Sequence, residues 1–214
     1  MRKICFAGLD HKNLCEICDI RSRMHFGKKY TKVYQMLKHA YFIICQASYQ
    51  PVDGFKKIIN HYVEIDSVID YRYREFYTVY DELEDTFGLE ELRELVENIY
   101  TNEYLGKLLP KWNEGLQEQD ALTVIPLQRD FFYKYVRSNK ERTAVIISDG
   151  MRFEVGCELF QRMRDNPKCK DSLSIQPMLS VLPSYTRLGM EALLPHKTLQ
   201  RMRYSGCAQR QWKR

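Results

Sequence analysis

The sequence lacks the apolar segments that would place a protein in or across a membrane. It has no run of about 18 uncharged apolar residues, the length that a membrane-spanning helix needs. Its first segment, MRKICFAGLDHKN, is interrupted by charges too soon for a secretory signal. The seven cysteines are odd in number and scattered, which favours reduced thiols. We therefore expect a cytoplasmic protein that makes no membrane contact.

Phosphate-binding glycine loops are also missing. Neither a GxxxxGK[ST] run nor a GxGxxG run occurs, and there is no internal repeat or low-complexity linker. Charge is abundant but uneven, although the net value is only +5. Residues 60–104 carry 13 Asp and Glu against 3 Lys and Arg, whereas residues 197–214 carry 6 Lys and Arg and no acid. Such a basic tail attracts nucleic acid or is simply a solvated, disordered end.

Apolar spacing predicts helices through most of the chain before residue 140. Side chains recur every three or four residues, and Pro110 is expected to end the third of these helices. The tyrosines lie at helical core spacing, so packing explains them better than base stacking. The predicted helical segments are 28–48, 55–80, 89–109 and 127–137.

The pattern changes at Thr143. The β-branched run TAVIIS predicts a strand buried on both faces, and Asp149-Gly150 supplies a turn. Helical spacing returns over 151–165, LSIQPMLSVL (173–182) suggests a second strand, and a helix follows PSYT. Strand–helix–strand–helix is typical of an α/β domain with a parallel sheet. We therefore expect an all-α segment over 1–140, an α/β domain beginning over 141–196, and a basic tail over 197–214.

Asp149 and Thr186 are the leading candidates for chemistry. Open parallel sheets bind ligands beyond the carboxyl ends of their strands, and each residue follows one predicted strand. A carboxylate there suits a divalent metal, and a metal would help the Thr186 alcohol to lose its proton. The alternative is structural: Asp149 could cap the helix at 151, and Ser184 or Thr186 could start the next helix.

Other candidates carry weaker signals. Arg152 could contact an anionic substrate or be an ordinary surface arginine, and His196 could be a ligand or the end of a helix. Cys15 and Cys18 form CEIC between two histidines, but the spacing is unusual for zinc and no second cysteine pair exists.

Two segments carry a family resemblance: VIISDGMRFEVGCEL and LPSYTRLGMEALLPH. Together they resemble the PglZ domain of the alkaline phosphatase superfamily, most closely the type A phosphatase component of BREX phage-defence systems. The helical stretches IDSVIDYRYREFY and LVENIYTNEYLGKLLPKWN are similar to the part that precedes the phosphatase domain in those proteins.

The resemblance implies a set of roles. Asp149 matches the position of a metal ligand, and Thr186 matches the nucleophile position, which also binds metal; Ser184 is the weaker match. The implied reaction is hydrolysis of a phosphate ester through a phospho-threonine, with a divalent metal, zinc in the intact family member. The implied partners are other BREX proteins, with any contact to DNA being indirect.

The sequence also departs from the family pattern. The remaining Asp and His metal ligands of the superfamily lie further along the chain than this sequence extends, and family members are longer on the N-terminal side. We therefore expect a piece of a longer protein, inactive alone, from a pseudogene, a frameshifted reading frame or a split gene. The rival hypothesis is a non-enzymatic helical module that docks a partner protein.

Overall fold

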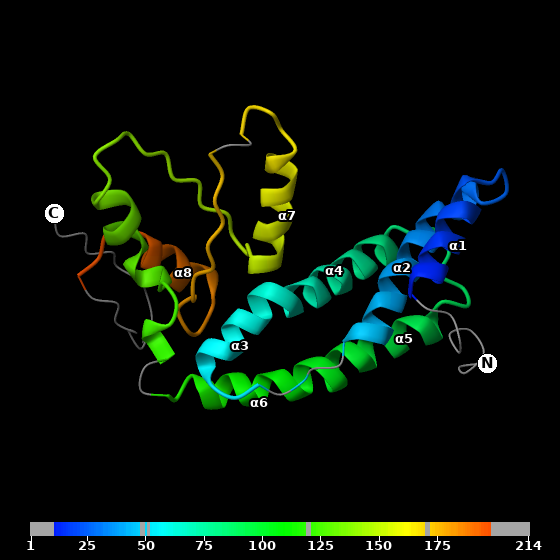
Figure 1. The fold of residues 1–214 in the computed structure, drawn as a ribbon, viewed down its shortest axis with the longest axis horizontal. Helices are drawn as coiled ribbons and strands as arrows, with labels where there is room; N and C mark the ends of the chain where they lie inside the picture. The colour runs from blue at the N-terminus through cyan, green and yellow to red at the C-terminus, as the bar shows by residue number, and fades with distance from the viewer. Residues whose placement is uncertain (1–10, 48–49, 51, 119–120, 170–171, 198–214) are drawn as a thin grey trace, which may run out of the picture. The chain divides into compact units, whose positions relative to one another are not determined.

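The structure is a computed structural model that describes residues 11–47, 50, 52–118, 121–169 and 172–197. Helices dominate this part of the chain (Figure 1). None of the described helices has both the length and the apolar character needed to cross a membrane. The α-helices are α1 (His11–Arg23), α2 (Thr31–Gln46), α3 (Phe55–His61), α4 (Ser67–Asp81), α5 (Glu90–Asn98), α6 (Gly106–Gly115), α7 (Phe153–Arg164) and α8 (Thr186–Leu193).

Short helical turns of other kinds link or follow these α-helices. The 3₁₀ turns are η1 (Lys28–Tyr30), η4 (Ala121–Thr123) and η5 (Gln128–Asp130). The π-helical turns are η2 (Tyr62–Asp66), η3 (Ile99–Leu105) and η6 (Phe132–Arg137). By its internal contacts the chain divides into a first unit, residues 1–124 with 151–177, and a second unit, residues 125–150 with 178–214.

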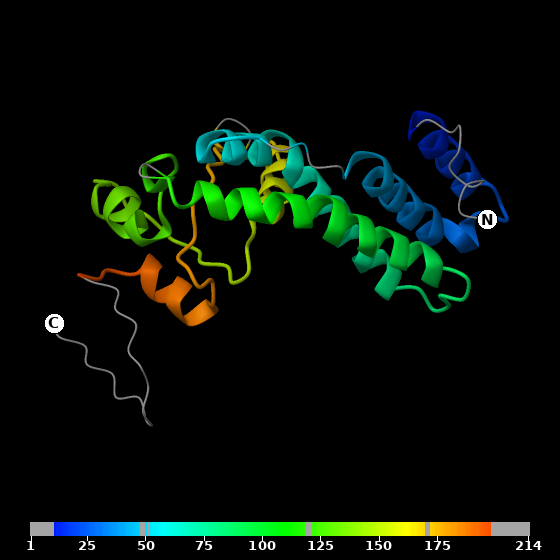
Figure 2. The ribbon, with the colours of Figure 1, turned by 90° about the horizontal axis from the view of Figure 1, so that it is seen from below.

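The first unit is built on two long helical rods. One rod joins α3 to α4 through η2, and the other joins α5 to α6 through η3 (Figures 1 and 2). Helix α2 packs on α4, α1 and α5, and α3 packs on α6. Apolar side chains from these elements form one core, which includes Met36, Ala40, Ile43, Ile58, Ile69, Phe76, Val96, Tyr100, Tyr104 and Leu108. Burial of this shared face holds the helices together.

The helical predictions for this unit are largely confirmed. Helices lie within the predicted segments 28–48, 55–80 and 89–109, and Tyr100 and Tyr104 are buried core residues. The prediction that Pro110 ends its helix is wrong, because α6 continues through it to Gly115. The π-helical turn η3 directly precedes α6, so the backbone hydrogen bonds are already irregular just before Pro110. Because proline has no amide N–H, it removes one further hydrogen bond from this irregular stretch, and the helix continues.

Two buried aspartates of the first unit are hydrogen-bonded by neighbouring side chains. Tyr62 and Tyr100 donate hydrogen bonds of 2.7 and 3.0 Å to the carboxylate of Asp70. Burial, reinforced by the charge of Asp70, raises the pKa of both tyrosines. Asp66 pairs with His61 at 2.8 Å, although burial still raises the Asp66 pKa. These bonds offset the cost of burying polar groups between apolar helices.

The second unit contains η5, η6 and α8. Leu127 and Leu179 form an isolated parallel bridge, with Gln128 N–H donating to the Leu179 carbonyl at 2.9 Å. The Gln128 side chain accepts from the amide of Val181 and donates to the carbonyl of Gly189. Backbone and side-chain bonds from one residue therefore connect three stretches of this unit. The predicted helix over 127–137 is present only as 3₁₀ and π turns, and Tyr135 is exposed.

The prediction of an α/β fold with the start of a parallel sheet is wrong for this chain. No strand is present in the described residues: segments 143–148 and 173–182 are both extended but unpaired apart from the Leu127–Leu179 bridge. A strand needs a neighbour for its backbone hydrogen bonds, and TAVIIS has none among the residues whose placement is described. Its apolar side chains are accordingly uncovered, with Ile146 94% exposed.

Candidate functional site

Asp149 and Thr186 meet in the second unit. Thr186 Oγ1 donates a hydrogen bond to Asp149 Oδ2 at 3.3 Å, although 37 positions separate the residues in the sequence. Both side chains are exposed, so a ligand can reach them. Gly150 adopts a φ of +66°, a left-handed conformation that residues with a Cβ rarely adopt. This turn at Gly150 ends the extended segment directly after Asp149.

The structure does not show Asp149 as a helix cap, whereas Thr186 does start the next helix, as the structural alternative expected. Helix α7 begins at Phe153 with Arg152 in the N-cap position, so Asp149 lies three residues before the cap. Helix α8 begins at Thr186 itself, and the extended residue Tyr185 is its N-cap. Neither cap residue makes a side-chain cap hydrogen bond. The side chain of Thr186 is instead directed to Asp149.

The pair supplies two oxygen atoms that suit a divalent cation, but not a complete metal site. A catalytic zinc usually has three protein ligands. Among the described residues there is no group of three or more His, Cys, Asp or Glu side chains that could hold a metal ion. The role of Asp149 and Thr186 as metal ligands therefore stays a prediction. The same finding leaves the CEIC segment of α1 without a zinc site in the described region.

Arg152 lies in the first unit, whereas Asp149 and Thr186 lie in the second. Its guanidinium is within 3.3 Å of Glu154 Oε1, and its side chain remains 58% exposed. Arg152 therefore forms an ion pair within its own unit, and its predicted contact with a substrate at Thr186 stays a prediction.

His196 and Ser184 lie in the second unit near the ends of α8. The Nδ1 atom of His196 lies 2.8 Å from the carbonyl oxygen of Leu194, which can only accept a hydrogen bond from it. Tyr133 donates a 2.7 Å hydrogen bond to the His196 carbonyl, and the two rings contact edge to face. Ser184 is exposed two residues before α8.

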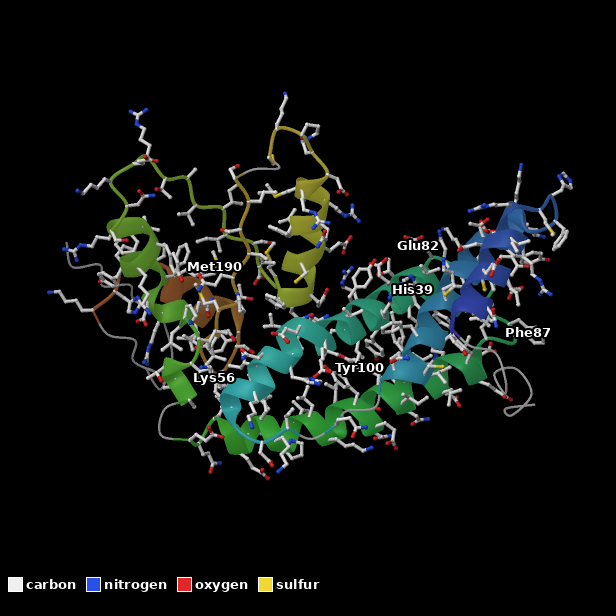
Figure 3. All side chains as sticks on the ribbon, viewed as in Figure 1. His39, Lys56, Glu82, Phe87, Tyr100 and Met190 are labelled. Carbon is white, nitrogen blue, oxygen red and sulfur yellow. The ribbon has the colours of Figure 1, made fainter. Side chains whose placement is uncertain are left out.

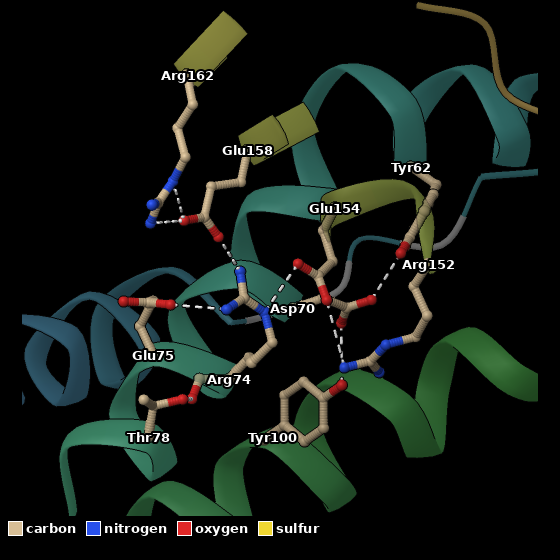
Figure 4. Close-up of polar contacts among 10 residues, drawn as sticks. All are labelled: Tyr62, Asp70, Arg74, Glu75, Thr78, Tyr100, Arg152, Glu154, Glu158 and Arg162. Atoms are coloured by element: carbon tan, nitrogen blue, oxygen red, sulfur yellow. Dashed lines mark hydrogen bonds and ion pairs between the residues drawn. The ribbon is translucent and has the colours of Figure 1, made fainter. Parts of the chain in front are cut away.

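An ion-pair network in the first unit was not predicted from the sequence. Arg74 of α4 donates to Glu75 at 2.7 Å and, across to α7, to Glu154 at 3.2 Å and Glu158 at 2.6 Å (Figure 4). The Glu154 side chain is only 1% exposed. Arg74 and Arg162 lower the pKa of Glu158 by hydrogen bonding and charge. The sequence signal was the Glu154–Glu158 spacing, which places two carboxylates on one helical face.

Comparisons with known proteins match the part of the chain that contains Asp149 and Thr186. The family described as the BREX system PglZ alkaline phosphatase-like domain matches residues 129–207. The alkaline phosphatase-like protein PglZ of Bacillus cereus (strain H3081.97) is 36% identical over an alignment of 205 residues that covers 89% of this chain and 23% of that protein. The alkaline phosphatase-like protein BrxZ of Escherichia coli O9:H4 (strain HS) is 37% identical over an alignment of 121 residues that covers 52% of this chain and 14% of that protein. No solved structure gives a significant match.

These matches confirm the resemblance. The chain is homologous to alkaline phosphatase-like proteins, and within that class it is related to the PglZ family of the BREX system. It spans less than a quarter of the length of either curated relative. The activity, substrates and partners of a whole protein are therefore proposals for this chain.

Proposed function

We propose that this chain is part of a metal-dependent phosphatase in which Thr186 is the nucleophile and Asp149 and Thr186 are metal ligands. The 3.3 Å hydrogen bond between these two side chains is the observation that carries the proposal. It brings an alcohol and a carboxylate together from distant parts of the sequence, within a region that matches an alkaline phosphatase-like family. Both groups face solvent, where a phosphate ester can approach.

The residues have distinct tasks in the proposed reaction. Thr186 Oγ1 forms a bond to phosphorus while the ester P–O bond breaks, and the alcohol product leaves with a proton. Water then attacks the phospho-threonine, which releases inorganic phosphate and returns the Thr186 hydroxyl. Thr186 is the first residue of α8, so the amides of that first turn favour the negative charge of the phosphoryl group. A divalent metal, zinc by family resemblance, would lower the pKa of the attacking alcohol.

The chain alone is expected to be a poor catalyst. Asp149 and Thr186 supply two ligands, and the described residues offer no larger ligand group. A weakly held metal gives little stabilisation to a developing negative charge. Metal-dependent hydrolysis of p-nitrophenyl phosphate by the purified 214-residue chain, abolished by Thr186→Ala, would contradict this expectation.

The mechanism is tested in a longer protein that contains this segment. Thr186→Ala should reduce phosphatase turnover by at least about a thousandfold and abolish phosphoenzyme trapping by acid quench, because the attacking oxygen is lost. Thr186→Ser retains a hydroxyl and should keep measurable turnover. Asp149→Asn should lower bound metal, measured by elemental analysis. If Thr186→Ala still forms a phosphoenzyme, the assignment of the nucleophile is wrong, and Ser184→Ala is then the informative variant.

For cellular context, we propose a cytoplasmic role in phage defence together with other BREX proteins and with indirect access to DNA. The family description supports the BREX context. Co-purification of the longer protein with BREX components, followed by DNA binding with and without them, tests the proposal. Direct DNA binding by the isolated protein at physiological salt would contradict the indirect route.

A helical interaction module is the alternative function. Helix α1 and the turn after it expose a run of apolar side chains, Ile17, Ile20, Met24 and Phe26, which is the kind of surface that binds another protein. On this alternative, Ile20→Lys would abolish partner capture while Thr186→Ala would have no effect on the biological activity. On the phosphatase proposal, Thr186→Ala eliminates that activity.

A further inference from the structure

The chain between α1 and α2 forms a basic turn that carries exposed aromatic side chains. Residues 20–32, which we call the basic turn, contain five Lys and Arg and no Asp or Glu. Phe26 and Tyr30 are 59% and 49% exposed. The backbone of the turn is hydrogen-bonded to itself, with the Gly27 N–H donating to the Met24 carbonyl at 2.9 Å. The turn therefore presents its charges and rings from an ordered backbone.

The chain between α4 and α5 forms a turn of opposite charge. Residues 81–91, which we call the acidic turn, contain six Asp and Glu and no Lys or Arg. Phe87 lies in its middle and is 91% exposed. The Phe87 N–H donates to Asp85 Oδ1 at 2.9 Å, and Gly88 follows with a left-handed φ of +80°. The acidic turn thus also presents an aromatic ring from a defined backbone.

The two turns lie at the same end of the first unit, away from α3 and α6 (Figures 1 and 2). They meet where Lys32 Nζ approaches Glu82 Oε2 at 3.1 Å, and Glu82 and Phe87 are labelled in Figure 3. Most of the other charges of the turns take no part in the ion pairs of the described residues. These are Arg21, Arg23, Lys28, Lys29, Asp81, Glu84, Asp85, Glu90 and Glu91.

We propose that this end of the first unit is a self-complementary surface through which two copies of the chain form a twofold dimer. A twofold axis places each residue pair in the interface twice, so the basic turn of each copy faces the acidic turn of the other. Phe87 of one copy would pack against Phe26 and Tyr30 of the other, since aromatic side chains are enriched in protein interfaces. The proposal does not rest on the phosphatase proposal.

Charge favours a second copy over other occupants of this surface. A nucleic acid or an anionic membrane would suit the basic turn alone, and the neighbouring carboxylates of the acidic turn would repel its phosphates. An acidic protein segment would meet the same repulsion. A second copy places an opposite charge against both turns at once.

Sedimentation equilibrium of the 214-residue chain tests the proposal. All proteins in the test carry Ile146→Lys, so that the exposed Ile146 of the second unit does not contribute to association. This parent should show a monomer–dimer equilibrium. Its dimer should weaken by at least about tenfold from about 50 mM to about 500 mM NaCl, because salt screens pairs of exposed charges.

A charge swap identifies the surface. Lys28→Glu with Lys29→Glu reverses the basic turn, and Glu84→Lys with Glu91→Lys reverses part of the acidic turn. Each double variant alone should be monomeric, because like charges then face each other across the twofold axis. An equimolar mixture of the two should regain the dimer, because the reversed turns attract each other.

The matched control is Lys56→Glu with Lys57→Glu, an adjacent exposed lysine pair on α3, which should dimerise like the parent. Phe87→Ser should weaken the dimer by at least about tenfold, the loss expected for an interface aromatic residue. Its unfolding temperature should not change, because the side chain is 91% exposed. If circular dichroism shows that a charge variant is misfolded, Phe87→Ser decides.

Four outcomes would overturn the proposal. They are a parent that stays monomeric at about 1 mM, where even very weak association is detected, and a mass that grows beyond two copies with concentration. The others are a mixture of folded charge variants that stays monomeric, and dimers that persist in both charge variants alone. A monomeric parent that binds an oligonucleotide would assign the basic turn to nucleic acid instead.

Discussion

At the residue scale, Glu154 is a buried carboxylate that forms ion pairs with two arginines. Its side chain is 1% exposed and lies between Arg74 and Arg152 (Figure 4). A buried charge is tolerated only when paired, and removal of one partner leaves the other without compensation. Arg74 is therefore a residue whose loss should cost more than the loss of an ordinary surface arginine.

We predict that Arg74→Ala destabilises the chain by about 3 kcal/mol, because Glu154 then stays buried with reduced neutralisation. Urea unfolding followed by circular dichroism measures this. Arg162→Ala is the matched control: Arg162 pairs with the same Glu158 but is 77% exposed, so its loss should cost less than about 1 kcal/mol. Equal losses in the two variants would show that burial of Glu154 is not what makes Arg74 important.

His39 gives a second residue-scale prediction, on pH. Burial, with the adjacent charge of Arg72, lowers the pKa of His39 from 6.5 to about 4. Protonation therefore favours the unfolded chain, so stability should fall as the pH drops from about 6.5 towards 4. His39→Gln should make that fall shallower, as measured by urea midpoints across the pH range. His25→Gln, at an exposed position, is the control and should leave the slope unchanged.

At the element scale, helices were predictable and strands were not, for a physical reason. A helix closes its backbone hydrogen bonds locally, so apolar spacing over 28–48 and 89–109 was sufficient to predict α2 and α5 (Figure 3 shows the side chains they pack). TAVIIS has strand composition, but its bonds must come from another segment, which spacing cannot reveal. The Asp149–Thr186 pairing was anticipated because each residue follows an apolar run. The Arg74 network was not anticipated, because it joins Arg74 to residues 80 and 84 positions further along the chain.

Two glycines allow an element-scale prediction with opposite signs. Gly150→Ala should destabilise the second unit by about 1 kcal/mol, because a side chain at a φ of +66° is strained even in open space. Gly156 lies within α7, where an added Cβ meets Ile175 at an ordinary contact distance of 3.9 Å. Gly156→Ala should therefore stabilise by about 0.5–1 kcal/mol. Thermal unfolding of both variants measures the difference, and stabilisation by Gly150→Ala would refute the turn argument.

At the scale of the whole molecule, the second unit exposes several large apolar side chains. Ile146 is 94% exposed, and Leu182 and Tyr185 are 64% and 51% exposed. Uncovered apolar side chains on extended, unpaired backbone favour association between copies. We therefore expect aggregation of the purified chain to depend on these exposed side chains more than on the buried helical core.

We predict that Ile146→Lys changes unfolding stability by less than about 0.5 kcal/mol, because the side chain makes few contacts to lose. The same change should reduce aggregation, measured by static light scattering against concentration. Ile43→Lys is the contrasting variant: Ile43 is fully buried, so a charge there should unfold the first unit. A large stability loss in Ile146→Lys would show that the residue is covered in solution.

The ion pairs between Arg74 and helix α7 also have an evolutionary consequence. The recognisable family segment begins at residue 129, yet one of its buried charges is neutralised by a side chain at position 74. A change at 74 leaves an uncompensated charge at 154 or 158, so we expect the stability effects of substitutions at these positions to be coupled rather than additive. Inheritance of the segment from 129 onwards without its upstream helices would separate these charges. The helices before residue 129 thus neutralise a buried charge that lies inside the segment matched by the family.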